Sequence, residues 1–378
     1  MSQSKTIRAG VPSFRCVIAL MVMAFAPIVG CFSPATAFAI GTVINVPAKA
    51  GGEGIQKALD GLPNGGEVVL EAGTYLIHQP VILQRDGQTL HGAGATTILY
   101  LADNANCPVV VLGSPARRPS GPTAGLVLSD LLIDGNRKNQ RAEVWRSLAE
   151  GALYNNGIDV WNVNGAAVER VVCCRCRSGG LVSTARTRRL TVIDFTAFDN
   201  QFDGLACYST EESRFSHLDL HDNLGAGISL DLDFNHNVID GAVLTGNDLG
   251  VFMRQSRNNT FESLKITKSR HHGVFMAQTA DGMRLCPGTE CTGNTFDKLL
   301  VADCGGRAFL VNNASCISNI ISSSQFLDNA QGGLSQARTN PVTVRDLVEH
   351  HTPAAFSVLG PLIGQAPDHA TVGGLKNL

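Results

Sequence analysis

The chain has 378 residues, of which 44% are hydrophobic and 16% are charged, and its formal net charge is −2. This composition excludes a disordered chain, because the apolar content can build a core and the net charge is small. It also argues against a nucleic-acid-binding protein, since no domain-wide positive excess is present to neutralise phosphates.

The first 39 residues have the layout of a secretory signal peptide. Three basic residues, the last of them Arg15, precede an uncharged apolar run at residues 17–29, and small residues suited to cleavage end at Ala39. The run is short for a bilayer span, so we expect a secreted or periplasmic protein without a membrane-spanning segment. The alternative is a lipoprotein, because the residues up to Cys31 resemble a loose lipoprotein box.

The next segment predicts a short helix followed by strands. Residues 52–60 place Ile55, Ala58 and Leu59 on one helical face, and residues 66–101 alternate apolar strands with glycine turns. A helix at this position would cover the open end of a sheet and protect its edge from pairing with other chains.

A repeat of about 23 residues runs through the middle of the chain. Six glycines open short apolar segments at nearly constant spacing: Gly157, Gly180, Gly204, Gly227, Gly250 and Gly273. Three short strands and three turns per repeat suit one turn of a parallel β-helix, in which stacked turns share a continuous core. We therefore predict an all-β parallel β-helix with an N-terminal capping helix, its six glycine-led strands in one parallel sheet.

The repeat also sets the domain boundaries. We predict a signal peptide over 1–39, one β-helix domain over 40–335, and a C-terminal cap or tail over 336–378. Two stretches interrupt the repeat as insertions, at 136–156 and 280–295.

The cysteines give two further predictions. Cys173 and Cys207 fall at inward positions, so we expect them to be buried free thiols. Cys286 and Cys291 flank a Pro-Gly-Thr-Glu segment, and we expect them to close a small surface loop in an oxidising compartment.

The order of motifs resembles the pectate-lyase-like right-handed β-helix superfamily over roughly residues 42–330. The helix with IQKAL is followed by GGEVVLEAGTY, GQTLHGAG and LLIDGN, and then by the glycine-led turns. Residues 130–208, with VERVVCCRCRSGG and RRLTVIDFTAFDNQFDG, look most like the mannuronan C5-epimerase branch. The resemblance implies an extracellular protein that acts on a uronate polysaccharide.

The chain departs from that branch at its hallmark motif. The Asp-Pro-His-Asp/Glu tetrapeptide of the family would begin at Val182, where the sequence reads Val-Ser-Thr-Ala. The usual tyrosine before that turn's glycine is replaced by Gly179, and the acidic residue expected one turn later aligns with Tyr208. The resemblance therefore supports the fold and the substrate class more than it supports epimerisation.

Alternation along each glycine-led strand predicts which side chains face outward. The apolar positions one and three residues after each glycine should point inward, so the fourth position should face solvent. That outward column comprises Trp161, Thr184, Tyr208, Asp231, Arg254 and Ala277. Because adjacent strands lie about 4.8 Å apart, Tyr208, Asp231 and Arg254 should stack side by side.

These three residues are the predicted catalytic group. Removing the proton beside a uronate carboxylate needs a group that neutralises the carboxylate and a base, which can be Arg, Lys, Tyr or His. Arg254 could be the base or the neutralising cation, and Tyr208 the acid or the base. The alternative is an ordinary surface ion pair between Asp231 and Arg254, which would contribute little to stability.

Five further residues are predicted to bind substrate or metal. Asp233 lies two residues after Asp231, so alternation places both on one face, where they could hold Ca²⁺. Trp161 could serve as a platform for a sugar ring, or it could pack under the loop of residues 136–156. Asp203 and His272 each precede a turn's glycine and could lean over the same cleft, and Asp159 lies on the same outward face.

Three functions remain open on this evidence. The first is a lyase or C5-epimerase that acts on an anionic, uronate-rich polysaccharide. The second is an inverting glycoside hydrolase, because residues i and i+2 of a strand lie about 6.5–7 Å apart and inverting carboxylates about 6.5–9.5 Å. The third is a non-catalytic β-helix that binds glycans or belongs to the cell envelope.

Overall fold

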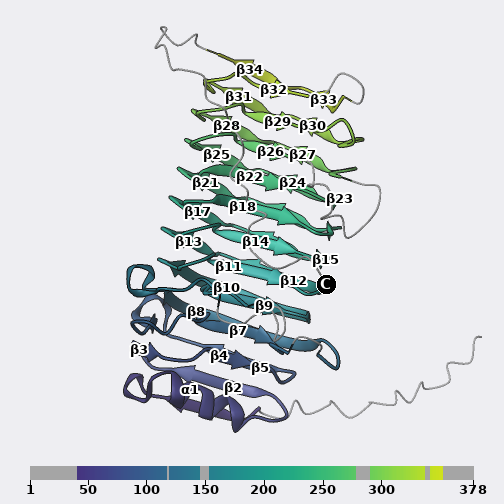
Figure 1. Cartoon of the computed structure of the whole chain (residues 1–378). Helices are drawn as coiled ribbons and strands as arrows, with labels where there is room; N and C mark the ends of the chain where they lie inside the picture. Colours follow the sequence, from purple (N-terminus) through teal and green to yellow (C-terminus); the bar gives the residue numbers. More distant parts are fainter. Residues whose placement is uncertain (1–40, 117–118, 145–152, 278–289, 337–340, 352–378) are drawn as a thin grey trace, which may run out of the picture. The chain divides into compact units, whose positions relative to one another are not determined.

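The computed structural model describes residues 41–116, 119–144, 153–277, 290–336 and 341–351. These residues form a stack of β-strand turns with one α-helix at its start (Figure 1). The predicted signal peptide and Cys286 lie outside the described residues. No helix among the described residues is long and apolar enough to cross a membrane.

Three sheet faces run along the stack, and all their strand pairs are parallel. The first face is a separate ten-stranded sheet. Its strands are β4 (Val81–Leu83), β7 (Val110–Gly113), β9 (Ile158–Trp161), β11 (Leu181–Thr184), β14 (Leu205–Tyr208), β18 (Ala226–Asp231), β22 (Leu249–Met253), β26 (Val274–Met276), β29 (Phe309–Val311) and β32 (Leu334–Ser335). All six glycine-led strands are in this sheet, which confirms that prediction.

The other two faces are joined into one 24-stranded sheet, because two long strands bend around the corner between them. These are β8 (Thr123–Asp134) and β10 (Val163–Cys174). The second face also contains β1 (Val43–Val46), β2 (Gly66–Leu70), β5 (Gln88–His91), β12 (Thr187–Ile193), β16 (Arg214–Ser216), β20 (Val238–Asp240), β24 (Thr260–Glu262), β27 (Thr295–Asp297), β30 (Ile320–Ser322) and β33 (Thr343–Arg345). The third contains β3 (Gly73–Ile77), β6 (Thr97–Leu101), β13 (Thr196–Phe198), β17 (Asp219–His221), β21 (Val243–Thr245), β25 (Lys265–Thr267), β28 (Leu300–Ala302), β31 (Gln325–Leu327) and β34 (Val348–His350).

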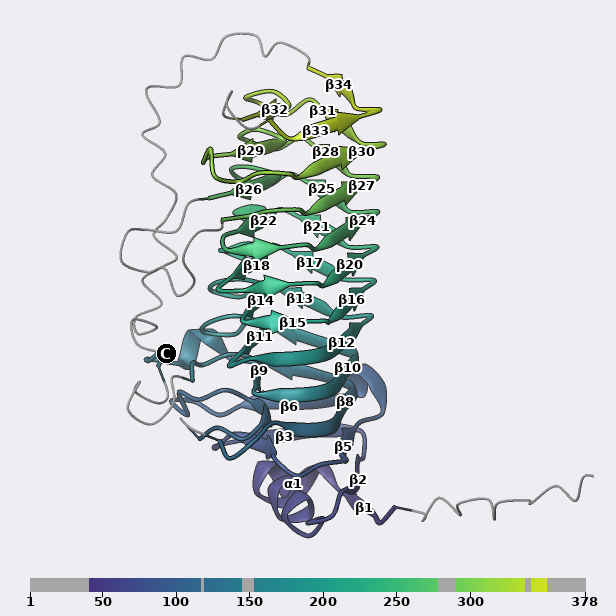
Figure 2. The ribbon, with the colours of Figure 1, turned by 90° about the vertical axis from the view of Figure 1, so that its right-hand side faces the viewer.

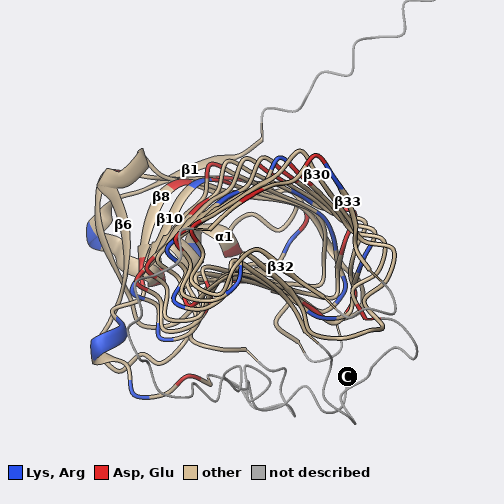
Figure 3. Cartoon of the chain, turned by 90° about the horizontal axis from the view of Figure 1, so that it is seen from above, with Lys and Arg blue, Asp and Glu red and all other residues tan. Residues whose placement is uncertain are grey.

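Short elements complete the turns. Between the first and second faces lie the two-residue strands β15 (Thr210–Glu211), β19 (Phe234–Asn235) and β23 (Ser256–Arg257). Three single-turn 3-10 helices occur in connections: η1 (Ala48–Ala50), η2 (Gly94–Thr96) and η3 (Arg137–Asn139). Seen along the axis, the turns superimpose into one outline with Lys, Arg, Asp and Glu distributed around it (Figure 3).

The register shows that the repeat length is nearly constant. Equivalent positions on the first face pair in the series Ile158, Leu181, Leu205, Ile228, Val251 and Val274, in steps of 23 or 24 residues. The next partner of Val274 is Phe309, 35 residues later, so one turn contains an insertion. The predicted repeat is therefore confirmed for the middle of the chain.

The core fills the space between the three faces. The residues one and three positions after each glycine are fully buried, as in the pairs Ile158 with Val160 and Ile228 with Leu230. Cys173 and Cys207 are also buried and unbonded, which confirms that prediction. A stack of this kind derives its stability from contacts between neighbouring turns, because no single turn can bury its own apolar side.

The helix α1 (Gly51–Asp60) covers the first turn, as predicted (Figure 2). Its buried residues include Ile55, Ala58 and Leu59, which is the expected apolar face. At the other end the ladders continue past residue 335, because β33 and β34 pair with β30 and β31. Both of these last strands are exposed and lack the apolar pattern of the earlier turns.

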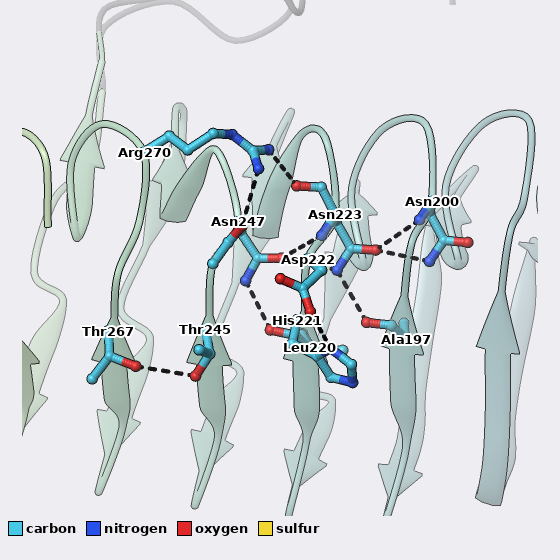
Figure 4. Close-up of polar contacts among 11 residues, drawn as sticks. Ala197, Asn200, Leu220, His221, Asp222, Asn223, Thr245, Asn247, Thr267 and Arg270 are labelled. Carbon is cyan, nitrogen blue, oxygen red and sulfur yellow. Dashed lines mark hydrogen bonds and ion pairs between the residues drawn. The ribbon is translucent and has the colours of Figure 1, made fainter.

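Two asparagine ladders support the corners of the stack. The first asparagine ladder consists of Asn200, Asn223 and Asn247 (Figure 4), and the second consists of Asn237, Asn259, Asn294 and Asn319. After the first member of each ladder, each side-chain oxygen accepts from the asparagine one turn before. These later asparagines also donate from their side-chain nitrogens to backbone carbonyls, as Asn223 does to Ala197 at 3.0 Å. The ladders therefore satisfy buried polar groups by repetition.

Candidate functional site

The predicted catalytic residues are neighbours on the outward side of the first face. Tyr208 at the end of β14 is the direct Cα partner of Asp231 at the end of β18. The backbone nitrogen of Arg254 donates to the carbonyl of Leu230 at 2.8 Å, which extends the same ladder by one turn. Three consecutive turns thus bring these three side chains together, as predicted from their shared position four residues after a glycine.

The ion pair within this group is buried. One guanidinium nitrogen of Arg254 lies 2.5 Å from the Asp231 carboxylate, and the two side chains are 10% and 3% exposed. The backbone nitrogen of Leu232 also donates to Asp231, at 2.8 Å. We expected these residues to face solvent, and the alternative was a weak ion pair at the surface. Both expectations are wrong, because the outward side of these strands is itself buried.

The outward face is buried because side chains pack on it from more than one turn. Phe252 and Phe275, two positions after their glycines, are 4% and 6% exposed and form an apolar cluster with Leu249. The guanidinium carbon of Arg254 lies 5.2 Å from the centre of the Phe252 ring, a cation–π distance. The charged pair is therefore bordered on one side by aromatic rings.

Burial raises the pKa of Asp231, and a second carboxylate contributes. Loss of solvent around Asp231 is the largest cause, Arg254 acts in the opposite direction, and the charge of Glu290 raises the pKa of Asp231 further. Glu290 is itself buried. We did not predict this residue, because it lies within the insertion at residues 280–295 and has no counterpart in the repeat.

Tyr208 is the half-buried member of the group. Burial raises the pKa of its hydroxyl far above the ordinary value, and the charges of Asp203 and Asp231 raise it further. Its hydroxyl hydrogen-bonds to Ser229 on the next turn. Tyr208 is thus a neutral phenol with a proton to donate. Asp203 is buried, and its Oδ1 accepts from the backbone nitrogen of Ala226 at 2.7 Å.

The predicted calcium pair is not formed. Strand β18 ends at Asp231, and Leu232 and Asp233 both have left-handed backbones, with φ values of 51° and 71°. The alternation that would place Asp231 and Asp233 on one face therefore stops. Asp233 instead pairs with Arg257, while Asp231 pairs with Arg254. These residues do not fit a Ca²⁺ site, because an arginine neutralises each carboxylate.

Two predicted substrate-binding residues on β9 are also buried. Trp161 is 2% exposed and packs with Val111 and Leu153, so its ring is not an open platform for a sugar. Asp159 accepts from Asn156 at 2.7 Å, but its second oxygen is buried without a hydrogen-bond partner. Burial raises the pKa of Asp159 to about 8, so this carboxyl is largely protonated at neutral pH.

His272 is held as a neutral ring. Its Nδ1 accepts from the backbone nitrogen of Arg307 at 2.9 Å, which leaves the proton on Nε2. Burial, His271 and Arg307 all lower the pKa of His272. Its ring centre lies 5.5 Å from that of Phe275, so it belongs to the aromatic border of the site rather than to the ion pair.

The segment that aligns with the family tetrapeptide contributes to the core in this chain. Ser183, in the middle of that segment, points into the core, where its hydroxyl lies 2.8 Å from that of Thr210. Val182 lies between Asp159 and Ala206 on the outward side of the sheet. The polar cluster found here thus begins one turn later, at Tyr208.

Fold and sequence comparisons place the chain in a family. Residues 156–346 match the family described as right handed beta helix region, and the chain belongs to this family. A curated relative, the mannuronan C5-epimerase AlgE3 of Azotobacter vinelandii, is 29% identical over 174 residues, which is 43% of this chain. The match spans only 9% of the length of that relative.

Solved structures share the fold at lower sequence identity. The A-module of the mannuronan C-5 epimerase AlgE4 of Azotobacter vinelandii superposes with a TM-score of 0.59 and 18% identity, covering 78% of this chain and 90% of the module. The ORF18 protein of Geobacillus virus E2 has the same TM-score and 13% identity, covering 81% of this chain and 59% of that protein. These likenesses show the β-helix fold that the repeat predicted, with the right hand that the resemblance implied.

Proposed function

We propose that this chain is a secreted or periplasmic enzyme that acts on a uronate polysaccharide as a lyase or C5-epimerase. The observation that carries the proposal is the convergence of Tyr208, Asp231 and Arg254 on three successive turns of one face. A tyrosine, a carboxylate and an arginine supply the acid, the base and the cation that this chemistry requires. The match to a mannuronan C5-epimerase supports the substrate class.

The environments of the three side chains assign their roles. Arg254 neutralises the substrate carboxylate, since its Nε is a buried donor without a hydrogen-bond partner among the residues that the structure describes. Asp231, whose pKa is raised, is a stronger base than an ordinary carboxylate and accepts the proton beside that carboxylate. Tyr208, a neutral phenol, donates a proton to the sugar carbon in an epimerase or to the leaving oxygen in a lyase. Tyr208 is half-buried and connects the cluster to solvent.

A second candidate function rests on Glu290. Asp231 and Glu290 are both buried, and the charge of Glu290 helps to raise the pKa of Asp231; paired carboxyls are the catalytic groups of glycoside hydrolases. In that case Asp231, with its raised pKa, would be the general acid. The carboxyl pair first considered, Asp231 with Asp233, is not proposed again.

Product analysis separates these functions. The protein is incubated with mannuronan, a galacturonate polymer and a neutral glucan. Ultraviolet absorbance from an unsaturated uronate indicates a lyase, and an altered sugar configuration at unchanged chain length indicates an epimerase. New reducing ends without that absorbance indicate a hydrolase. No turnover on any polymer would overturn the enzymatic proposal and favour a binding or structural β-helix.

A matched pair of variants tests the site on whichever polymer is turned over. Tyr208→Phe removes one hydroxyl and should lower kcat by about 100-fold or more, as expected for loss of a general acid. Tyr100→Phe on β6 makes the same change on another face and should leave kcat unchanged. Equal activity of both variants would place the catalytic site elsewhere on the chain.

A further inference from the structure

Two cysteines occupy the same inward position on consecutive turns. Cys291 and Cys316 lie three residues before Asn294 and Asn319, which are adjacent members of the second asparagine ladder. The side chain of Asn319 donates to the carbonyl of Cys291 at 3.0 Å, which fixes the register of the two turns at this corner. Both cysteines belong to the buried core, with exposures of 0% and 1%.

The spacing of the turns suits a covalent bond between these residues. Equivalent positions on neighbouring parallel strands lie about 4.8 Å apart, and disulfide-bonded cysteines have Cα separations of about 4.4–6.8 Å. Burial, and then the neighbouring Cys316 thiol, raises the pKa of the Cys291 thiol, so the two side chains lie within range of each other.

We propose that Cys291 and Cys316 form a disulfide that links the two turns when the protein folds in an oxidising compartment. Each thiol loses one proton and one electron as the sulfur–sulfur bond forms. The oxidant is a disulfide-bonded thiol compound or protein, whose own disulfide is reduced to two thiols. Because both sulfurs are buried in the folded chain, the exchange takes place while these turns are still open.

The bond would act on the part of the stack that borders the candidate site. Cys291 directly follows Glu290, the buried carboxylate near Asp231, and lies within the same insertion. A disulfide here closes a 25-residue span of chain and lowers the conformational entropy of the unfolded state. It excludes the predicted pairing of Cys286 with Cys291, because each sulfur forms one such bond.

Peptide mapping of the full chain distinguishes the pairings. The protein is refolded with a mixture of oxidised and reduced glutathione, its free thiols are blocked, and it is digested with trypsin without reduction. Cys286 and Cys291 share the peptide of residues 285–298, whereas Cys316 is the one cysteine of residues 308–338. We expect these two peptides to be linked and about 2 Da lighter than their sum. A peptide 285–298 that loses this mass alone, or two fully blocked peptides, would overturn the proposal.

Serine variants identify the linked sulfurs. Cys286→Ser and Cys304→Ser should retain the cross-link, whereas Cys291→Ser and Cys316→Ser should lose it. Addition of a reductant should lower the Tm of the oxidised wild-type protein by several degrees and leave the Tm of Cys316→Ser unchanged. If the wild-type Tm is insensitive to reductant, the bond is absent from the folded protein. The test on the wild-type Tm can be interpreted even if Cys291→Ser and Cys316→Ser fail to fold.

Discussion

The first asparagine ladder and the Asp231–Arg254 pair are two buried polar arrangements in one stack, and their differences are instructive. In the ladder each amide is bonded to its neighbours, and the same arrangement recurs turn after turn (Figure 4). The ion pair occurs at one place, leaves Arg254 Nε without a partner, and raises the pKa of Asp231. A polar group that repeats serves the fold, whereas a polar group that is unique and incompletely satisfied points to function.

The largest stability effect should come from dividing the ion pair. Arg254→Ala leaves the Asp231 carboxylate buried without its cation, which should lower the free energy of unfolding by about 3–5 kcal/mol. Arg257 lies three residues after Arg254, and its side chain is more exposed. Arg257→Ala removes an ion pair of the same kind and should cost about 1 kcal/mol or less. Chemical denaturation of both variants checks this. Equal losses would mean that burial does not distinguish the two pairs.

Interrupting the ladder should have the next largest effect. Asn247→Ala removes the acceptor of the Asn223 backbone nitrogen and the donor to the Leu220 carbonyl. Each buried group left unpaired costs about 1–3 kcal/mol, so we expect a total loss of about 2–4 kcal/mol. Thr245→Val, which removes a hydroxyl contact to Thr267 at the partly exposed surface, should cost less than about 1 kcal/mol. Similar Tm values for the two variants would contradict a structural role of the ladder.

A third test uses the pH dependence of stability. The pKa of Asp159 is about 8 in the folded chain, above its ordinary value, so the folded state retains a proton that the unfolded state has lost. The free energy of unfolding should therefore fall as the pH rises from about 4 to about 8. Asp159→Asn should remove most of this slope and stabilise the protein at pH 8 by about 1–3 kcal/mol. The exposed carboxylate variant Asp60→Asn should keep the wild-type slope, and an unchanged slope in Asp159→Asn would refute the assignment.

The smallest stability effect is expected at Tyr208. Loss of one half-buried hydroxyl in Tyr208→Phe should change the free energy of unfolding by about 1 kcal/mol or less, although we expect a large loss of activity. Thermal unfolding and enzyme kinetics, measured on the same preparation, test whether activity is lost while stability is retained. A strongly lowered Tm would indicate that the hydroxyl supports the fold and would weaken the comparison drawn above.

The repeat in the sequence was sufficient to predict the fold. Glycine spacing and apolar alternation depend on local backbone geometry, so they predicted the strands of the first face and their inward residues. The adjacency of Tyr208, Asp231 and Arg254 follows from the same periodicity. These features are predictable because each turn repeats the geometry of the one before it.

The environment of the site was less predictable for two physical reasons. Alternation indicates the side of a strand on which a residue lies, but not what packs there, so the burial of Asp231 and Arg254 was missed. Periodicity also fails where the chain leaves the strand. The left-handed backbone at Leu232 and Asp233 ended the alternation, and Glu290 lies within an insertion that no repeat describes.

The insertion between β26 and β27 shows how such a protein can diversify. Val274 pairs with Phe309, and Phe275 with Leu310, in the register that the shorter turns use, although 35 residues separate the partners. The frame therefore tolerates extra chain at this corner, since strand pairing resumes on the far side. Segments of different length or composition could be exchanged here during evolution or engineering. Specificity could then change while the stack beneath it stays the same.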